Sequence, residues 1–391
     1  MNKSIVLITD VPTPYRIHHY GKLYKAFQEK GIDFRVEFMA LTVPIRFWTF
    51  ESNDFGFPYK IRKGLRIHVS GNTYHFNPMI IVATVFNKPD ILFVGGAWNI
   101  PSSFLSIFAF KFFALEKRKV MLWSEANRHS VSHSNRFFDG LRNYINSFVD
   151  AFIVPGELAV STIRHDWGQV GKSFFKMPNL IDDDKFRANI ISPNQGIRSF
   201  REELKIANDQ IVAIWPARLH EETKGIINFL SAVREIVLGS NLRILIAGGG
   251  PDEQKIDSWV KEHLSEHVTL LGQRIEKEML LLYKEADILF LPSMKDPNPL
   301  TVIEGLWSSL PVLISSHCGN FIEAVEEGVN GWVVNPNDQK SMKSAVGKLL
   351  GSEREDFRRM GARSVEIAHK EFQTDAAVAR FVDEVTKEVG G

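Results

Sequence analysis

Two carboxylates, Asp296 and Glu304, lie on either side of a loop that leads from a predicted strand into a predicted helix. The strand ends at Leu291, a segment rich in Pro and Asn follows, and the helix is expected to begin near Thr301. The backbone amides of such a loop and the positive end of the helix form a pocket suited to a diphosphate. Because phosphate oxygens do not bind carboxylates, we expect the two side chains to accept hydrogen bonds from hydroxyl groups, such as those of a sugar.

Each carboxylate also has a structural interpretation. The spacing of Thr301 and Glu304 is that of a capping box, in which the glutamate stabilises the start of the helix. Asp296 precedes Pro297, and an aspartate at such a position commonly forms a turn. The local pattern alone leaves these alternatives open.

Two cations six residues apart, Arg218 and Lys224, follow the first strand predicted in the second half of the chain. Cations so spaced on a loop can hold one diphosphate between them, although each alone is more commonly a partner in a surface ion pair. The next strand ends in three glycines, 248–250, which permit close approach to a ligand or simply a tight turn. Their spacing is not that of the G-x-G-x-x-G dinucleotide fingerprint, so we exclude that class of site.

Short apolar segments alternate with helical stretches in the first half of the chain. Strands are predicted at 4–9, 35–40, 91–94, 120–124 and 151–154, with a helix over 17–29. Apolar strands that alternate with helices indicate a parallel sheet covered on both faces.

The same pattern restarts in the second half. Strands are predicted at 210–216, 242–247, 268–271, 288–291 and 312–315, and helices at 225–238, 251–264, 277–285 and 302–308. We therefore predict an α/β fold with two Rossmann-like parallel-sheet domains. Ligands bind beyond the carboxyl ends of the strands in such sheets, so two facing sheets place a substrate in a central cleft.

The domain boundaries are predicted from composition. Residues 1–185 form the N-terminal domain, the polar and irregular segment 186–196 forms the linker, and residues 197–370 form the C-terminal domain. The last predicted helix, 371–391, is expected to pack back towards the N-terminal domain.

The charges are unevenly distributed, although the net charge is only +1. Residues 1–185 hold 23 Lys and Arg against 16 Asp and Glu, whereas the remaining residues hold 24 against 30. A basic half can face an anionic partner such as a lipid surface, and random variation over a solvated surface explains the split equally well. No nucleic-acid partner is expected.

An aromatic stripe in the basic half has two interpretations. It consists of Phe104, Phe108, Phe112 and Leu115, and it lies near Lys111, Lys117, Arg118 and Lys119. Core packing is the expected role of residues at this helical spacing, and a membrane-facing surface is the alternative.

The single cysteine, Cys318, cannot form an internal disulfide, which fits a reducing compartment. We find no secretory signal, and the most apolar segment, 100–115, contains too many Ser and Lys residues to span a bilayer. A cytoplasmic protein is therefore predicted. No metal is expected, because Asp182–Asp184 forms an acidic run beside the linker and the adjacent His18 and His19 diverge around a helix.

Several motifs, in their order and spacing, resemble those of the retaining glycosyltransferases of family four, which have the GT-B fold. The matching segments are Ala217–Leu219 with Lys224–Gly225, Gly248–Pro251, Leu271–Ile275, Pro292–Ser293 before Asp296 and Glu304, Pro311–Val312, Asn330–Gly331, and Pro178–Asn179 with Asp182. The resemblance covers roughly residues 150–370, and the linkage of several motifs makes it specific.

The resemblance implies roles for the four charged residues. Arg218 and Lys224 hold the donor diphosphate and stabilise the charge of the leaving group. Glu304 binds the ribose of the nucleotide. Asp296, which stands where the family usually has a glutamate, binds hydroxyl groups of the donor sugar with a side chain one methylene shorter.

Further donor contacts are implied in the C-terminal domain. The backbone amides of Leu300 and Thr301 contact the phosphates and the sugar. Arg274 and Ile275 border the base, and Gly249 belongs to the same donor-binding set.

In the N-terminal domain, the usual glycine-rich first loop is replaced by Pro12–Arg16, which is similar to the opening of bacterial polysaccharide-assembly members. This loop is expected to bring Arg16 to the cleft. The family often has a histidine near the donor sugar, and here either Glu125 or His129 is the candidate for that role. Arg16 and Glu125 are therefore counted among the donor-binding residues.

The implied activity is retaining transfer of a hexose or N-acetylhexosamine from a nucleotide diphosphate sugar, with UDP or GDP as the nucleotide and without a metal. The implied acceptor is a glycan or a lipid-linked glycan that the N-terminal domain binds, in cell-surface polysaccharide synthesis, by an enzyme peripheral to the inner face of the membrane. The alternatives are an epimerase of the same fold and a non-catalytic sugar-nucleotide-binding protein. A phosphorylase would need a pyridoxal lysine, for which the sequence offers no distinctive candidate.

Overall fold

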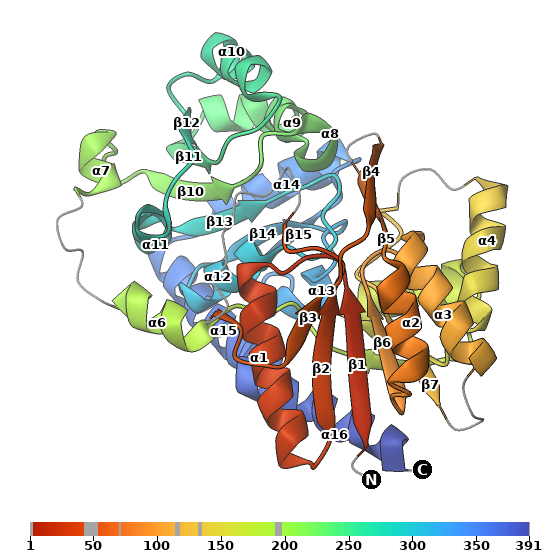
Figure 1. Cartoon of the computed structure of the whole chain (residues 1–391). Helices are drawn as coiled ribbons and strands as arrows, with labels where there is room; N and C mark the ends of the chain where they lie inside the picture. Colours follow the sequence, from red (N-terminus) through yellow and green to blue (C-terminus); the bar gives the residue numbers. More distant parts are fainter. Residues whose placement is uncertain are drawn as a thin grey trace. The chain divides into compact units, whose positions relative to one another are not determined.

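The computed structural model describes residues 3–42, 54–69, 72–113, 118–131, 135–191 and 198–390. The chain divides into two compact units (Figure 1). Unit 1 comprises Met1–Leu180 and Thr374–Gly391, and unit 2 comprises Ile181–Gln373. Each unit contains one parallel sheet with helices packed on it.

The sheet of unit 1 has seven strands in the order β3-β2-β1-β6-β7-β8-β9, and each neighbouring pair is parallel. The strands are β1 (Ser4–Thr9), β2 (Asp33–Phe38), β3 (Tyr59–Ile61), β6 (Ile91–Gly95), β7 (Lys119–Trp123), β8 (Ala151–Val154) and β9 (Ser173–Lys176). A separate antiparallel pair consists of β4 (Leu65–Val69) and β5 (Asn72–Phe76). The central strands are buried along almost their whole length, because helices cover both of their faces.

Two groups of helices cover this sheet. The helices of unit 1 are α1 (Pro14–Glu29), α2 (Pro78–Phe86), α3 (Pro101–Phe113), α4 (Arg136–Ser147), α5 (Glu157–Ser161) with a following π-helical turn (Thr162–Asp166), and α16 (Thr374–Gly390). Ile80 of α2, Ile107 of α3 and Ile145 of α4 share one apolar cluster with the sheet, so these three helices cover the same face. α1, α2 and α3 each begin with proline, whose fixed φ favours the first turn of a helix.

The last helix, α16, packs against α1, although the whole of unit 2 separates them in the sequence. Lys22 pairs with Asp375 at 2.7 Å, and the rings of Phe27 and Phe381 lie 6.5 Å apart. The residues expected to return to the N-terminal domain therefore complete unit 1.

Unit 2 has a six-stranded parallel sheet in the order β12-β11-β10-β13-β14-β15. The strands are β10 (Ile211–Pro216), β11 (Leu242–Ala247), β12 (Val268–Gly272), β13 (Ile288–Leu291), β14 (Val312–Ser315) and β15 (Gly331–Val334). The helices are α6 (Asp183–Ile191), α7 (Phe200–Glu203), α8 (Glu221–Lys224), α9 (Ile226–Leu238), α10 (Glu253–His263), α11 (Glu276–Glu285), α12 (Leu300–Trp307), α13 (Phe321–Ala324), α14 (Gln339–Leu350) and α15 (Arg354–Glu371).

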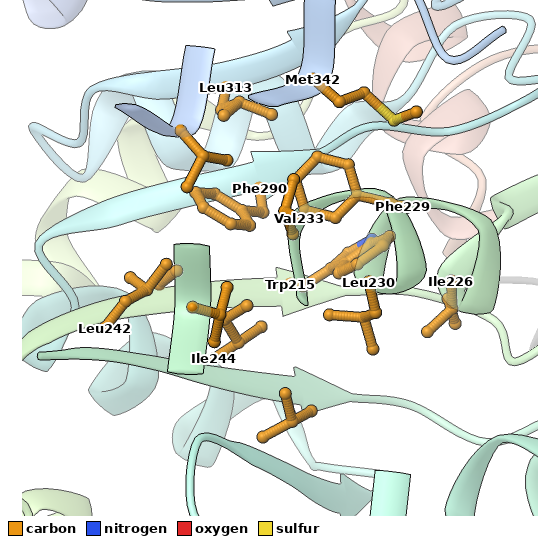
Figure 2. Packing of buried hydrophobic residues seen from close by; sticks show 14 of the residues in the cluster. Trp215, Ile226, Phe229, Leu230, Val233, Leu242, Ile244, Phe290, Leu313 and Met342 are labelled. Atoms are coloured by element: carbon orange, nitrogen blue, oxygen red, sulfur yellow. The ribbon is translucent and has the colours of Figure 1, made fainter. Parts of the chain in front are cut away.

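The core of unit 2 is built around aromatic rings between the sheet and α9 (Figure 2). Phe229 of α9 meets Trp215 of β10 and Phe290 of β13 edge to face, with ring centroids 5.6 and 5.7 Å apart. Full burial of such a side chain stabilises the fold by roughly 1.5–3 kcal/mol. These contacts fix α9 and the two central strands, and therefore also the loops that leave those strands.

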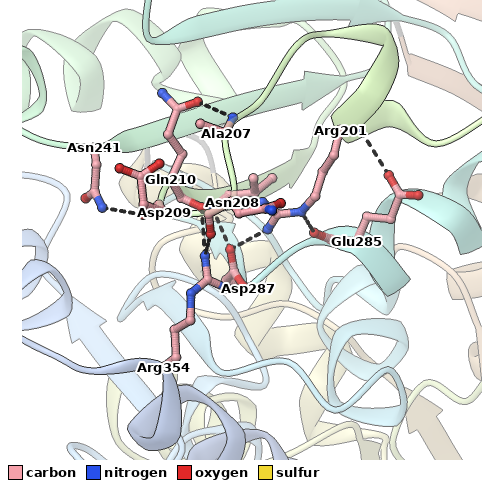
Figure 3. A network of polar contacts seen from close by, with 10 residues as sticks. Arg201, Ala207, Asn208, Asp209, Gln210, Asn241, Glu285, Asp287 and Arg354 are labelled. Carbon is pink, nitrogen blue, oxygen red and sulfur yellow. Dashed lines mark hydrogen bonds and ion pairs between the residues drawn. The ribbon is translucent and has the colours of Figure 1, made fainter.

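A polar network fixes the opposite, amino-terminal ends of the same strands (Figure 3). Arg201 donates to Asp287 at 2.7 Å and to the carbonyl oxygen of Glu285 at 3.0 Å. Asp287 also accepts from the backbone N–H of Val212 at 2.8 Å, and Arg354 lies 3.5 Å from it. The network joins α7, α11, α15 and the starts of β10 and β13.

The expected linker requires correction. α6 occupies residues 183–191, which sequence analysis placed partly in the N-terminal domain and partly in an irregular linker, and residues 192–196 lie outside the described residues. Phe186 contacts Tyr283 of α11, and the guanidinium of Arg187 lies 4.9 Å from the ring of Trp307 in α12. These contacts place α6 in unit 2, and the boundary lies between Leu180 and Ile181.

Candidate functional site

The strand order of unit 2 places two loops next to each other beyond the carboxyl ends of β10 and β13. These strands are neighbours, but the chain continues outward to β11 and β12 on one side and to β14 and β15 on the other. Ligands of open parallel sheets bind at such a point. The loop after β10 holds Arg218 and Lys224, and the loop after β13 holds Asp296.

Lys224 and Asp296 form an ion pair, with Nζ 2.5 Å from Oδ2. Both side chains are largely buried, at 17% and 12% exposure. The backbone N–H of Lys295 donates to the carbonyl oxygen of Thr223 at 2.8 Å, so the two loops are also joined by their backbones. An anion that binds Lys224 must therefore compete with Asp296.

Gly225 makes this approach of the loops possible. Its φ of +59° lies in the left-handed region, where it ends α8 and starts α9. A Cβ atom there would lie 2.5 Å from Cγ of Met294 in the facing loop. Any larger residue would therefore strain the backbone and separate Lys224 from Asp296.

Arg218 is exposed, and its side chain makes no hydrogen bond or ion pair with any residue that the structure describes. Its backbone position is fixed, because Ala217 and Leu219 donate to the carbonyl oxygens of Ala247 and Gly249 at 2.9 and 3.1 Å. The guanidinium is thus free to bind an anion while the loop beneath it is held in place.

The three glycines after β11 serve mainly this backbone contact. A Cβ atom on Gly248 or Gly250 would overlap the carbonyl oxygen of Ala217 or Leu219. Gly249 differs, because the atoms nearest to its Cβ position belong to two side chains, Gln273 and Glu253. Two of the glycines are therefore explained by packing, and only Gly249 keeps the predicted ligand-binding role.

The start of α12 differs from the predicted capping box. Pro299 is the N-cap residue and no side chain caps the helix, so Thr301 lies inside the first turn. Glu304 instead accepts a hydrogen bond from the hydroxyl of Tyr283 at 2.6 Å. Within the described part of the chain, the backbone N–H groups of Leu300 and Thr301 have no hydrogen-bond acceptor, which leaves them available to an anion.

Burial raises the pKa of Glu304 above its ordinary value, and the hydrogen bond from Tyr283 opposes that rise. Burial also raises the pKa of Tyr283. The hydroxyl therefore keeps its proton and donates it to Oε2 of Glu304, while no described residue donates to Oε1. Glu304 is held as a hydrogen-bond acceptor whose second oxygen can bind a ligand hydroxyl.

Sequence analysis missed Asn298, which lies between two prolines in the loop before α12. It is 8% exposed, and neither its amide nitrogen nor its amide oxygen has a partner among the described residues. Buried polar groups are normally satisfied, so the unpaired amide is available to hydrogen-bond with a water or a bound molecule. The Pro-Asn-Pro sequence is the only local signal that could have singled it out.

Arg274 and Ile275 follow β12, where the base was expected. Arg274 is paired with Glu278 at 3.2 Å and lies 5.5 Å from the ring of Phe200. Ile275 is exposed, and its backbone N–H donates to the same glutamate at 3.0 Å. The structure thus orders this segment, and its contact with the base stays a prediction.

Unit 1 has its own polar cluster beyond β1 and β7. Arg16 pairs with Asp10 at 2.9 Å and with Glu125 at 3.4 Å. The structure thus brings together Arg16 and Glu125, and it adds Asp10, which sequence analysis did not name. His129, the alternative to Glu125, lies in a turn where its backbone N–H donates to the side-chain oxygen of Asn127 at 3.0 Å.

The adjacent histidines, His18 and His19, lie in α1. His19 is buried against Trp123, with ring centroids 5.5 Å apart, and burial lowers the pKa of His19 to about 3. Across the described ranges, no group of three or more His, Cys, Asp or Glu residues is arranged to hold a metal ion. Nor does any helix in those ranges have the length and apolar character needed to cross a bilayer.

Comparison with known proteins finds similarity to one family within unit 2. Residues 196–365 match the sequence profile of the family described as "Glycosyl transferases group 1". The alpha-monoglucosyldiacylglycerol synthase of Acholeplasma laidlawii is 31% identical over 179 residues, which are 45% of this chain and 43% of that protein. The D-inositol 3-phosphate glycosyltransferase of Nocardia farcinica is 28% identical over 207 residues, 49% and 45% of the respective chains. The chain thus aligns with less than half the length of each of these relatives.

Solved structures match over nearly the whole chain. HepE of Anabaena, in complex with UDP and glucose, has a TM-score of 0.70 at 14% identity and covers 98% of this chain and 99% of its own. The sucrose-phosphate synthase of Thermosynechococcus elongatus has a TM-score of 0.68 at 15% identity, with 98% of each chain covered. At these identities the likeness shows the fold alone. The chain therefore has the GT-B fold of two Rossmann-like units, and its residues 196–365 are similar to the group 1 glycosyltransferases.

Proposed function

We propose that the chain is a retaining glycosyltransferase that moves a hexose or N-acetylhexosamine from a UDP- or GDP-sugar to a glycan or lipid-linked acceptor. The observation that carries the proposal is the convergence of two loops beyond β10 and β13. They bring Arg218, Lys224 and Asp296 to the point in the sheet where ligands of such folds bind. The N-terminus of α12 supplies free amides on the loop that carries Asp296.

The chemical demand of this reaction is departure of a nucleotide diphosphate from the anomeric carbon. As the carbon–oxygen bond breaks, negative charge grows on the diphosphate and the sugar becomes oxocarbenium-like. Arg218, Lys224 and the amides of Leu300 and Thr301 stabilise that charge, and preorganised donors of this kind are among the largest contributors to catalysis. No protein side chain is assigned the role of a nucleophile.

Binding of the donor replaces the ion pair between Lys224 and Asp296 with one contact to each residue. When the diphosphate takes Lys224, the carboxylate of Asp296 loses its partner and accepts a hydrogen bond from a sugar hydroxyl. Free nucleotide offers only the first half of this exchange, whereas the complete donor offers both. The pair therefore favours the intact donor over the nucleotide alone.

Glu304 and Asn298 complete the proposed site. Glu304, held by Tyr283, binds the ribose through its free oxygen, and the unpaired amide of Asn298 binds a phosphate or a hydroxyl group. The base lies against Arg274 and Ile275, and Gly249 lets the nucleotide approach the end of β11. No metal takes part, and the cations of the loop neutralise the diphosphate instead.

The resemblance implies donor contacts for Arg16 and Glu125, but their pairing in a carboxylate-rich cluster with Asp10 leads us to propose that they bind the acceptor instead. The cluster has more carboxylate than cationic charge, which suits hydroxyl groups of a glycan better than a phosphate. A lipid acceptor fits the name of the alpha-monoglucosyldiacylglycerol synthase above. Polysaccharide synthesis fits the name of a putative colanic acid biosynthesis glycosyltransferase of Salmonella typhimurium, which is 25% identical over 168 residues that cover 41% of each chain.

The test begins with a panel of UDP- and GDP-sugars added to the full chain in the presence of a chelator. A donor at a hundred times its Kd stabilises the fold by about 2.7 kcal/mol, so the true donor should raise Tm visibly. The selected donor is then assayed for hydrolysis, transfer and inversion at ring carbons. Hydrolysis or transfer supports the proposal, binding without either indicates a non-catalytic protein, and conversion of the free donor indicates an epimerase. Loss of binding in the chelator would refute the metal-free site.

A further inference from the structure

The outer faces of α2, α3 and α4 carry all of the exposed Phe and Tyr side chains found among the described residues. We call this surface the aromatic face; its aromatic members are Phe86, Phe112, Phe113, Phe137, Phe138 and Tyr144, and Met79, Val82 and Leu141 are exposed beside them. Phe112 is 83% exposed and Phe137 is 71% exposed. Exposed apolar groups are normally scattered singly, so their concentration on three helices indicates an interaction surface.

The three helices form one continuous surface. They pack side by side on one face of the sheet of unit 1 (Figure 1). The ring of Phe108 in α3 lies 5.9 Å from that of Tyr144 in α4 and 5.0 Å from that of Phe148. An apolar hollow of about 720 Å³ opens at this junction and is lined by Phe108, Ala109, Lys111, Phe112, Phe113 and Phe148.

The unpaired charges around the aromatic face are positive. Lys88 follows α2, Arg118 follows α3 and Arg136 begins α4, and none of the three has a carboxylate partner among the residues that the structure describes.

The nearby carboxylates are engaged within the fold. Asp150 binds Lys111 at 2.6 Å, and Asp139 binds Arg142 at 2.7 Å. Asp90 accepts from the backbone N–H of Ser4 at 2.7 Å. The surface therefore combines exposed aromatic rings with uncompensated positive charge.

We propose that the aromatic face docks unit 1 on a membrane surface that contains anionic phospholipid. Aromatic side chains favour the boundary between head groups and acyl chains, and cations nearby are attracted to anionic lipids. The hollow between α3 and α4 accommodates the end of an acyl chain or another apolar group of the interface. This inference rests on the proposed function in taking the acceptor to be lipid-linked, and it names the surface that brings the enzyme to that acceptor.

A second copy of the chain is a poorer occupant of this surface. A symmetric dimer would place the aromatic face against itself, because both subunits of a two-fold interface use the same patch. The unpaired cations of the two copies would then be brought near one another without carboxylates to pair with them. An anionic lipid surface supplies the missing negative charge.

The experiment is flotation of the full chain with vesicles of phosphatidylcholine, alone or mixed with phosphatidylglycerol. We expect stronger binding to the mixed vesicles and loss of that preference at high salt, because exposed charges are screened. The double variant with Phe137→Ser and Phe138→Ser should bind mixed vesicles at least about tenfold more weakly, because two aromatic rings that would be buried in the lipid interface are lost. Lys88→Gln, Arg118→Gln and Arg136→Gln should each weaken it about fivefold.

Matched controls come from unit 2. Leu238→Ser with Val329→Ser removes two exposed apolar side chains, and Lys340→Gln with Lys343→Gln removes two exposed cations. These variants should bind vesicles like the parent chain, and circular dichroism should show all variants folded. Equal binding to both vesicle types, or an aromatic-face variant that binds normally, would overturn the inference.

Two further measurements separate this inference from the proposed function. Thermal stabilisation by the donor should be the same in the parent and in every aromatic-face variant. If the donor does not stabilise the parent chain, that result counts against the donor site and not against docking. Sedimentation of the lipid-free chain tests self-association. A dimer that the Phe137→Ser and Phe138→Ser variant dissociates, without vesicle binding by the parent, would assign the face to a second copy and refute lipid docking.

Discussion

The two units place polar side chains at the same position of the same kind of sheet, but with opposite charge balance. In unit 2, Arg218 and Lys224 follow the first strand, and Asp296 is the carboxylate paired with Lys224. In unit 1, Asp10 and Glu125 both contact a single cation, Arg16.

This difference shows how one architecture can hold two unlike ligands. Two cations and a row of free amides favour a diphosphate, whereas two carboxylates around one arginine favour hydroxyl groups. The sheets are equivalent, and the loops alone decide the chemistry. Each of the following predictions tests whether the two clusters act on different ligands.

The largest effect is expected from the cations of unit 2. Arg218→Ala or Lys224→Ala should lower the transfer rate with a loss of roughly 2–4 kcal/mol in transition-state stabilisation, as for loss of one preorganised donor to a developing oxyanion. Initial rates at saturating acceptor measure the loss, and Lys340→Ala, an exposed lysine elsewhere in unit 2, is the control. Parental rates in both variants would remove the donor from this loop.

Asp296→Asn should separate donor binding from turnover. The substitution frees Lys224, so the affinity for free nucleotide should hold or rise, while the rate of transfer should fall at least about tenfold, or ~1.4 kcal/mol. Calorimetry with the nucleotide and rates with the full donor give the two quantities. Asp296→Glu keeps the charge and restores the usual length of the family's side chain, and it should retain more activity than the asparagine variant. If Asp296→Asn transfers sugar at the parental rate, Asp296 is a turn residue.

In unit 1, Glu125→Gln should reduce kcat/KM for the acceptor about tenfold, or ~1.4 kcal/mol, and leave the Kd of the donor unchanged. The physical reason is that Glu125 belongs to the proposed acceptor cluster of unit 1, whereas the proposed donor site lies in unit 2. Arg128→Ala is the matched control, because it breaks an exposed ion pair with Asp166, worth at most about 1 kcal/mol. If Glu125→Gln changes the Kd of the donor as much as it changes kcat/KM for the acceptor, the two clusters do not act on different ligands.

The smallest effects concern Glu304 and Tyr283. Tyr283→Phe removes the hydrogen bond to Glu304 and should weaken the binding of the nucleotide by about 1 kcal/mol. Glu304→Gln should weaken all donors that carry the same nucleotide, without the loss of helix stability that a capping box would predict, because Pro299 is the N-cap residue.

The pH dependence of stability tests the state of Glu304. Burial raises its pKa above the ordinary 4.5, so the unfolded chain loses this proton before the folded chain does. The free energy of unfolding should therefore fall as the pH rises above 4.5, and Glu304→Gln should lack that part of the decline. Denaturant titrations at a series of pH values measure it. Parallel curves for the parent and the variant would show that the carboxyl titrates normally.

The sequence predicted the central strands of both sheets, which are buried and apolar, but missed the buried edge strand β15. The predicted strands at 4–9 and 242–247 coincide with β1 and β11. Such strands are visible because burial on both faces requires continuous apolar residues. The hairpin of β4 and β5 was missed, because β4 is exposed along its whole length and both strands mix polar with apolar residues.

The candidate site was predicted in part, for a similar reason. Loop residues next to strand ends could be named, but the ion pair of Lys224 with Asp296 joins positions 72 residues apart, and no local pattern encodes it. The contact between Tyr283 and Glu304 is likewise long-range and replaced a capping box that local spacing favoured. Asn298 could be recognised only after its surroundings showed that its amide is buried and unpaired.

The return of α16 to unit 1 has a consequence for how the protein is made. During synthesis the sheet of unit 1 leaves the ribosome before unit 2, and the helix that covers Phe27 and Phe93 follows only after unit 2. Unit 2 is continuous in sequence and can fold in the interval. Until α16 emerges, the nascent chain therefore carries a folded unit 2 and a unit 1 with an uncovered apolar surface, and a variant that lacks α16 would keep that surface exposed.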